Sequence, residues 1–162
     1  MSDDLPPNDL PPNNLASDDR PSIGRIVDRE HRLGVRIYYE DTDFTGVVYH
    51  GNYLRFFERG RSEMLRVMGT PPDREDHGAF AVTRIAIDYK AGARIHDSLV
   101  VHTLFAGMQG PRLNFRQSIT RDGVTLTEAE VVAVAITPEG RARKPSATEL
   151  SHWNAYKSPS PN

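Results

Sequence analysis

The chain has 162 residues, of which 38% are hydrophobic and 26% are charged, and its formal net charge is −2. The length predicts one domain, and the near-neutral charge excludes a broad attraction to nucleic acid or anionic membranes. Because cysteine is absent, disulfides, a cysteine nucleophile, Fe–S clusters and thiolate zinc sites are excluded. The sequence shows neither an apolar run of membrane-span length nor the pattern of a secretory signal. We therefore expect a soluble, cytoplasmic, globular protein.

Two tails flank the predicted domain. Residues 1–24 contain five Asp, one Arg and five of the 12 prolines, and the sequence Asp-Leu-Pro-Pro-Asn occurs twice in them. This composition buries too little apolar surface to offset the entropy lost on ordering, so it predicts a disordered acidic arm. The polar, proline-containing residues 151–162 predict a shorter C-terminal tail. The folded domain is therefore expected at residues 25–150.

The first predicted elements are a strand and a long helix. Alternating apolar residues over 33–39 predict the strand. Asn52 is a candidate N-cap for the helix, and Gly69 followed by two prolines is a candidate stop. Between them, apolar residues with a 3.6-residue period predict a buried helix face formed by Tyr53, Phe56, Phe57, Gly60, Met64 and Met68.

Four strands are predicted after a polar stretch at residues 73–78. Alternating patterns place these strands at residues 81–89, 99–105, 113–119 and 124–137. Asp122-Gly123 predicts a hairpin turn before the last strand, whose core face is expected to carry Leu126, Val132, Val134 and Ile136. Short links between consecutive strands favour antiparallel pairing. The sequence therefore predicts an α+β fold, with a curved antiparallel sheet wrapped around one long central helix and with sheet edges that favour dimerisation.

The densest polar segment joins the first strand to the helix. It holds three carboxylates, Glu40, Asp41 and Asp43, together with His50. The segment runs into a helix N-terminus, where free amide N–H groups and the helix dipole can stabilise a developing oxyanion. A carboxylate and an imidazole beside such a helix start are suited to acyl transfer. The alternative is that the Asp side chains only cap turns and that His50 is only a hydrogen-bonding residue.

No metal or cofactor site is indicated elsewhere. The remaining histidines lack metal-ligand spacing, and the sequence contains no G-x-S-x-G elbow, G-x-G-x-x-G fingerprint or Walker A motif. We therefore expect no metal and no organic cofactor. Arg112 follows a glycine-bearing turn and is either a solvated hairpin residue or a phosphate clamp for a nucleotide-bearing substrate.

The polar segment and the helix resemble the signature of hotdog-fold acyl-CoA thioesterases, most closely the Tol–Pal-associated and bacterial 4-hydroxybenzoyl-CoA thioesterases. The matching residues of the segment are Tyr-Glu-Asp-Thr-Asp at 39–43, Gly-Val-Val-Tyr-His at 46–50 and Asn-Tyr at 52–53. The matching residues of the helix are Glu-Arg at 58–59, Arg61 and Glu-Met-Leu at 63–65. It implies a hotdog fold, cofactor-free hydrolysis of an acyl-CoA or acyl-carrier-protein thioester, and a homodimer or homotetramer with active sites at the dimer interface. The acidic arm is not a feature of that family.

The resemblance also implies roles for individual residues. Asp43 matches the catalytic carboxylate, which acts as nucleophile or as general base, and His50 matches the histidine that assists it. The expected substrate-binding residues are Tyr49, Gly51, Asn52 and Arg112. The first three lie at the helix start, whose N–H groups would polarise the thioester carbonyl, and the last matches basic residues that contact coenzyme A phosphates.

Two other functions stay open at the level of sequence. One is a non-catalytic acyl-CoA or acyl-carrier scaffold, which binds its ligand without turnover. The other is enoyl-CoA hydratase, which uses an Asp and His pair on the same fold but in a different motif. The motif around Asp43 favours the thioesterase. Glu58 is the next carboxylate to test if Asp43 is dispensable.

Overall fold

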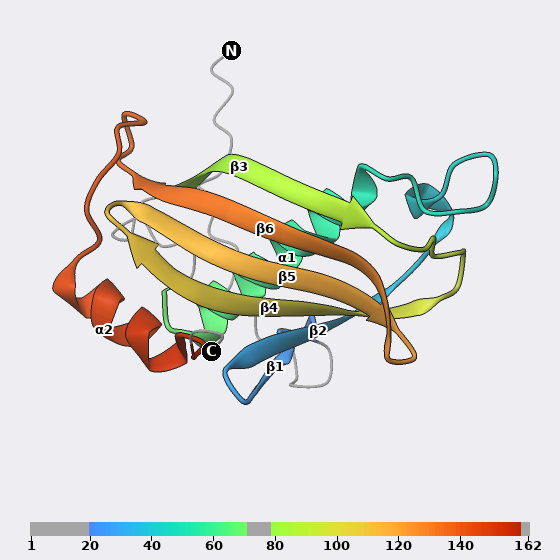
Figure 1. Ribbon diagram of the computed structural model, residues 1–162, viewed down its shortest axis with the longest axis horizontal. Helices are drawn as coiled ribbons and strands as arrows, with labels where there is room; N and C mark the ends of the chain where they lie inside the picture. Colours follow the sequence, from blue (N-terminus) through green and yellow to red (C-terminus); the bar gives the residue numbers. More distant parts are fainter. Residues whose placement is uncertain (1–19, 71–78, 160–162) are drawn as a thin grey trace, which may run out of the picture.

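A computed structural model describes residues 20–70 and 79–159, which form a six-stranded antiparallel sheet with a long helix across one face (Figure 1). The strand order is β1-β2-β4-β5-β6-β3. The strands are β1 (Arg25–Val27), β2 (Glu30–Arg36), β3 (Ala79–Tyr89), β4 (Ser98–Gln109), β5 (Arg112–Arg121) and β6 (Val124–Ile136). The helices are the 3-10 helix η2 (Tyr39–Asp41), α1 (Asn52–Val67) and α2 (Ala147–Tyr156). The predicted α+β class, a curved antiparallel sheet around a central helix, is confirmed.

The apolar stripe of α1 packs against the sheet as its spacing predicts. Phe57 and Met64 are fully buried. Gly60 lies so close to β4 that an added Cβ would stand 2.8 Å from Val101 Cγ1 and from Thr103 Oγ1. A larger residue at this position would push the helix away from the sheet.

Within the described ranges, no helix is both long and apolar enough to cross a membrane.

The two ends of α1 differ in how well the sequence predicts them. Asn52 is the first helical residue and Gly51 is the N-cap, so the predicted N-cap is wrong. The Asn52 side chain instead donates a hydrogen bond of 2.8 Å to the Asp41 carbonyl. The predicted stop is correct, because Gly69 has a φ of +79° and lets the Thr70 N–H reach back to the helix.

The N-terminal part of the sheet begins earlier than expected. The sequence predicted one strand before the helix, but the structure has two, because the short β1 pairs with β2. β2 starts at Glu30 rather than at residue 33, and Tyr39 lies in η2 instead of the strand. Residues 1–19 of the predicted acidic arm lie outside the described residues, as does the polar stretch 73–78. The first described residues are tied to β2, since His31 Nε2 and the Ile23 carbonyl form a 2.7 Å hydrogen bond.

The predicted core face of β6 is wrong beyond Leu126. The side chains buried against the interior are Thr127, Ala129, Val131, Ala133 and Ala135, whereas Val132, Val134 and Ile136 are only partly buried. The reason is a register shift in the pairing with β5, where Ile119 pairs with Thr127 but Thr120 pairs with Thr125. The extra residue, Leu126, shifts the alternation of β6 by one and turns the next side chains to the opposite face.

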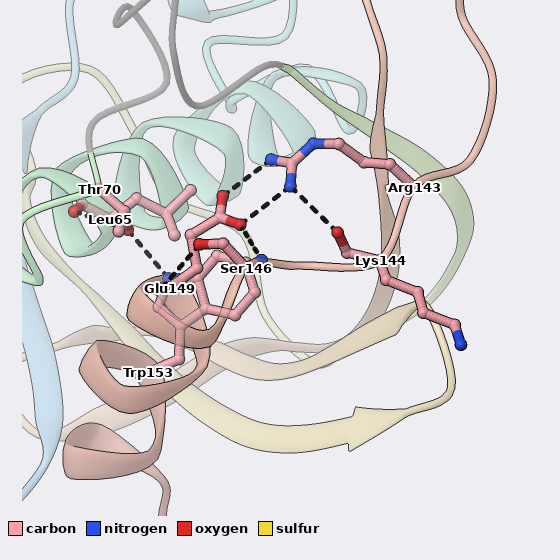
Figure 2. Close-up of polar contacts among 7 residues, drawn as sticks. All are labelled: Leu65, Thr70, Arg143, Lys144, Ser146, Glu149 and Trp153. Carbon is pink, nitrogen blue, oxygen red and sulfur yellow. Dashed lines mark hydrogen bonds and ion pairs between the residues drawn. The ribbon is translucent and has the colours of Figure 1, made fainter.

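The helix α2 overturns the predicted C-terminal tail and the predicted domain end at residue 150. Trp153 is 1% exposed, and its ring centroid lies 5.7 Å from that of Phe80 and 6.3 Å from that of Phe105. The Trp153 indole N–H also donates a 2.9 Å hydrogen bond to Thr70 Oγ1, just past the end of α1 (Figure 2). The periodicity missed this helix because α2 is anchored by one large aromatic side chain rather than by an apolar stripe.

The start of α2 is held by a buried carboxylate, shown in Figure 2. Glu149 is 2% exposed and accepts hydrogen bonds of 2.9 and 2.8 Å from the two Nη atoms of Arg143. It also accepts a 2.7 Å hydrogen bond from the Ser146 N–H. Burial alone raises the pKa of Glu149, but these donors outweigh burial and hold the pKa below its ordinary value.

We expect Glu149→Gln to destabilise the fold at neutral pH by about 2–4 kcal/mol, because it replaces a buried carboxylate that accepts two hydrogen bonds from Arg143 with a neutral amide. A carboxyl whose folded pKa is depressed stabilises the fold above its unfolded pKa, and this stabilisation is lost as pH falls through the folded pKa. The difference in melting temperature between wild type and variant should therefore shrink in acid. Thermal unfolding at neutral and acidic pH tests this, with the exposed Glu130→Gln as a control that leaves the melting temperature unchanged.

Candidate active site

Residues 41–49 form a tight hairpin that leads into α1. The Asp43 N–H donates to the Val47 carbonyl at 3.0 Å, and the Gly46 N–H donates to the Asp43 carbonyl at 3.1 Å. Val47 also forms an isolated antiparallel bridge with Arg94, in the loop between β3 and β4. The hairpin is therefore attached to the body of the fold, at the right-hand end of the sheet in Figure 1.

Asp43 is the carboxylate of this hairpin that is both ionised and accessible. Its Oδ1 accepts hydrogen bonds from Thr45 N at 2.8 Å and from Thr45 Oγ1 at 2.5 Å, which lower the pKa of Asp43. Among the described residues, its Oδ2 has no donor and is open to a water or a substrate. Asp41, by contrast, is turned inward and accepts a hydrogen bond from the Tyr38 N–H.

The start of α1 presents free backbone amides. The Tyr49 N–H donates a hydrogen bond to the Asp41 carbonyl, and the Asn52 N–H donates one to the Tyr49 carbonyl. In the part of the chain that the structure describes, the N–H groups of His50 and Gly51 have no acceptor. Two adjacent amides of this kind are suited to an oxyanion. The Asn52 side chain is not free for substrate, since it holds the hairpin through Asp41.

His50 belongs to an aromatic cluster rather than to a pair with Asp43. Its ring centroid lies 4.5 Å from that of Tyr49 and 6.2 Å from that of Tyr89, and the Tyr89 hydroxyl donates a 2.9 Å hydrogen bond to the His50 carbonyl. No hydrogen bond joins His50 to Asp43 within residues 20–70 and 79–159. No sequence motif pointed to Tyr89, which β3 brings to the helix start.

Arg112 lies at the far end of the sheet from Asp43. β5 runs for 10 residues from Arg112 to Arg121, and Arg121 forms a 2.6 Å ion pair with Asp97 at the hairpin end. A strand of that length spans about 30 Å. Figure 1 shows the same separation, with the β4–β5 turn at the left and the hairpin at the right. Within one chain, the structure therefore does not bring Arg112 and Asp43 together.

Exposed aromatic side chains surround the hairpin. Phe44 and Tyr39 are 101% and 81% exposed, and Tyr38, Tyr49 and Tyr89 are about half exposed. A contiguous exposed apolar patch is typical of an interaction surface, whereas single exposed apolar residues are common on any protein. No group of three or more potential metal ligands occurs among the residues that the structure describes.

Comparison with known proteins identifies the family. Residues 45–128 match the model of the thioesterase superfamily. The acyl-CoA thioester hydrolase YbgC of Escherichia coli O6:H1 is 42% identical over 110 residues, which cover 66% of this chain and 82% of that protein. The acyl-CoA thioesterase YbgC of Haemophilus influenzae is 39% identical over 114 residues, which cover 68% of this chain and 84% of the relative.

Solved structures give the same result. A probable thioesterase from Bartonella henselae matches with a TM-score of 0.69 and 36% identity, covering 72% of this chain and 99% of that one. A 4-hydroxybenzoyl CoA thioesterase matches with a TM-score of 0.71 over 76% of this chain and 98% of its own, at 20% identity, and so supports the fold alone. These matches confirm the resemblance that the residues between 39 and 65 carry, and the chain belongs to the thioesterase superfamily, with its hotdog fold.

Proposed function

We propose that this protein hydrolyses acyl-CoA thioesters, with Asp43 as the catalytic carboxylate. The observation that carries this proposal is the position of an ionised, accessible carboxylate on an ordered hairpin that leads directly to two free amides at the start of α1. In the general-base route, Asp43 takes a proton from a water whose oxygen attacks the thioester carbonyl. The C–S bond then breaks, and the CoA thiolate leaves and takes up a proton. In the nucleophilic route, a carboxylate oxygen attacks the carbonyl first, the C–S bond breaks to release the CoA thiolate, and water then hydrolyses the resulting mixed anhydride.

The other predicted site residues take supporting roles in this proposal. The N–H groups of His50 and Gly51 would hold the carbonyl oxygen as negative charge develops on it. The His50 ring would orient the substrate or water from the aromatic cluster, and Tyr49 would line the acyl side with its half-exposed ring. Asn52 is a positioning residue, because its side chain joins the hairpin to the helix start.

We also propose that the active form is at least a homodimer. β3 is an edge strand, and Val82 on it is 45% exposed, so a second copy could pair along this edge and cover it. Antiparallel pairing of two copies of β3 would carry the Arg112 end of one chain toward the Asp43 end of the other. Arg112 could then contact the phosphates of a CoA bound mainly by the partner.

The substrate and location follow from the same chemistry. Coenzyme A is the proposed carrier and acyl-carrier protein the alternative, and we propose that the protein acts in the cytoplasm, where CoA thioesters are made. The test is a panel of short, long and aromatic CoA thioesters, with the matching acyl-carrier-protein thioesters as a second arm. Release of thiol is followed directly, because the absence of cysteine removes any thiol background. Binding without release would overturn hydrolysis in favour of a scaffold.

The hydrogen bond from the Thr45 hydroxyl sets a testable pH dependence. Because this bond helps to lower the pKa of Asp43, Thr45→Val should raise that pKa, and the acid limb of the kcat/KM profile should move to higher pH. The control is Thr42→Val, since the Thr42 hydroxyl donates to the Tyr39 carbonyl and not to Asp43. An acid limb that stays in place in Thr45→Val would show that Asp43 is not the group whose ionisation limits the rate.

A further inference from the structure

A second pocket lies between α1 and the inner face of the sheet, away from the hairpin. It has a volume of about 240 Å³. Its apolar walls are Leu65 from α1, Phe80 and Val82 from β3, Phe115 from β5 and Ala133 from β6. Phe80 is backed by Trp153 of α2, with ring centroids 5.7 Å apart. We call this cavity the Arg61 pocket, after the cation that also lines it.

Arg61 is an unusual residue for such an apolar wall. It is 8% exposed, and among the described residues its one polar partner is the Gln117 side-chain oxygen, 2.8 Å from Nη1. The Gln117 side-chain amide already makes other hydrogen bonds, because its nitrogen donates to the Phe57 carbonyl and to Thr103 Oγ1. No described carboxylate forms an ion pair with Arg61, and a buried guanidinium without one is costly.

The positive charge of Arg61 is not neutralised by Glu58, the carboxylate that also lines the pocket. Glu58 is exposed and its Oε1 accepts a 2.6 Å hydrogen bond from Ser62 Oγ, not from Arg61. Burial lowers the pKa of Arg61, and the charge of Glu58 acts against that shift, yet a guanidinium stays protonated in proteins. A water-exposed carboxylate is well screened, whereas a buried cation acts in a low dielectric. The pocket therefore presents a net positive charge, that of Arg61, to a ligand that lies along its apolar walls.

One face of α1 connects this pocket to the proposed catalytic end. Gly51, Leu54, Glu58, Arg61 and Leu65 follow one another at intervals of three or four residues and so lie along a single stripe. Leu54 on this stripe is 37% exposed. The rise of a helix places Arg61 about 15 Å from Gly51 along the axis, a length that an extended dodecanoyl chain spans.

We propose that the Arg61 pocket binds the far end of an acyl chain that ends in a carboxylate. This assigns a substrate class, the CoA thioesters of dicarboxylic acids, and it rests on the proposed thioesterase function. The methylene chain would lie against Leu65, Phe80 and Phe115, and its terminal carboxylate would accept hydrogen bonds from the Arg61 N–H groups that no described residue uses. An acyl chain that ends in a methyl group would leave the buried cation unpaired and would bind more weakly.

Binding at the pocket can be measured without any hydrolysis. Trp153 is the only tryptophan of the chain and lies behind Phe80, so its fluorescence reports on occupancy. Octanoate should bind about tenfold or more tightly than octanol, which corresponds to one hydrogen bond to a charged group. Arg61→Met should abolish this preference, and Arg61→Lys should keep part of it. Equal affinity for both probes, no saturable change in emission, or an unchanged preference in Arg61→Met would each overturn the proposal.

A second variant covers the case in which Arg61 variants fail to fold. Ser62 is partly buried on α1 and lines the pocket, so Ser62→Phe should fill the pocket and weaken octanoate binding while the buried charge stays in place. The matched control is Ser151→Phe, a change at an exposed serine of α2 that does not line the pocket. Equal loss of binding in both variants, or no loss in Ser62→Phe, would overturn the proposal.

Kinetics separate this proposal from the proposed function. Dodecanedioyl-CoA should be hydrolysed with a kcat/KM about tenfold higher than dodecanoyl-CoA, and the ratio should fall to about one in Arg61→Met. If neither thioester is hydrolysed, the proposed function fails and octanoate binding still decides the pocket. If both are hydrolysed equally by the wild type, the function stands and the dicarboxylate class is overturned.

Discussion

Asp43→Asn is expected to lower kcat for thioester hydrolysis by about 100-fold or more, with a much smaller change in KM. The amide keeps the size of the side chain and an oxygen for the Thr45 hydrogen bonds, so the hairpin should persist. It can neither take a proton from water nor attack a carbonyl. Thiol release from the best substrate of the panel measures the loss, and circular dichroism checks that the fold is intact.

The control for this prediction is a second carboxylate on the same segment. Glu40 is exposed, so Glu40→Gln should retain activity if the effect is specific to Asp43 rather than to the local charge. An Asp43→Asn variant that stays active would contradict the proposed mechanism. Glu58, which lies on α1 beside the Arg61 pocket, would then be the next carboxylate to replace.

Trp153→Ala is expected to destabilise the protein by about 3–5 kcal/mol, as removal of a large aromatic side chain from a core does. The indole is 1% exposed and packs on Phe80 and Phe105, so its removal leaves a cavity between α2 and the sheet. It also removes the hydrogen bond to Thr70. Urea unfolding followed by circular dichroism measures the loss, since the variant has no tryptophan to report by fluorescence.

Two further variants provide comparison values for the loss of stability in Trp153→Ala. Trp153→Phe keeps most of the packing and loses the Nε1 hydrogen bond, so it should cost about 1–2 kcal/mol. His152→Ala changes an exposed neighbour on α2 and should stay within about 0.5 kcal/mol of the wild type. If Trp153→Ala were no more destabilising than His152→Ala, the docking of α2 on the sheet would be wrong.

The candidate site was predictable where it depends on one short segment. Asp43, His50 and Gly51 lie within one stretch of sequence, and the position of a helix start fixes where the free amides are. Other features of the site depend on distant residues. The sequence could not show that Tyr89 from β3 meets His50, or that Arg112 lies at the other end of the sheet. Whether Arg112 contributes to a neighbouring site depends on a second copy of the chain.

Local periodicity accounts for most of the correct fold predictions. The 3.6-residue stripe of α1 and the alternation of the strands each follow from repeated side-chain directions, which neighbouring residues alone set. Gly69 and the Asp122-Gly123 turn were also predictable, because each requires a positive φ that few residues adopt. For the same reason, the order from β2 through α1 to β6 could be read without knowing any contact, whereas β1 and α2 could not.

Tertiary structure decided the features that join residues far apart in the chain. The bulge at Leu126 is set by pairing with β5, and it reverses the face of β6 that local alternation would assign to the core. α2 is held by Trp153 against β3 and β4 and by the ion pair of Glu149 with Arg143, and none of these contacts produces a periodic pattern. Arg61 likewise reads as a polar helix residue until the sheet buries it. Burial and pairing energies arise only when distant segments meet, so the sequence pattern of one segment cannot contain them.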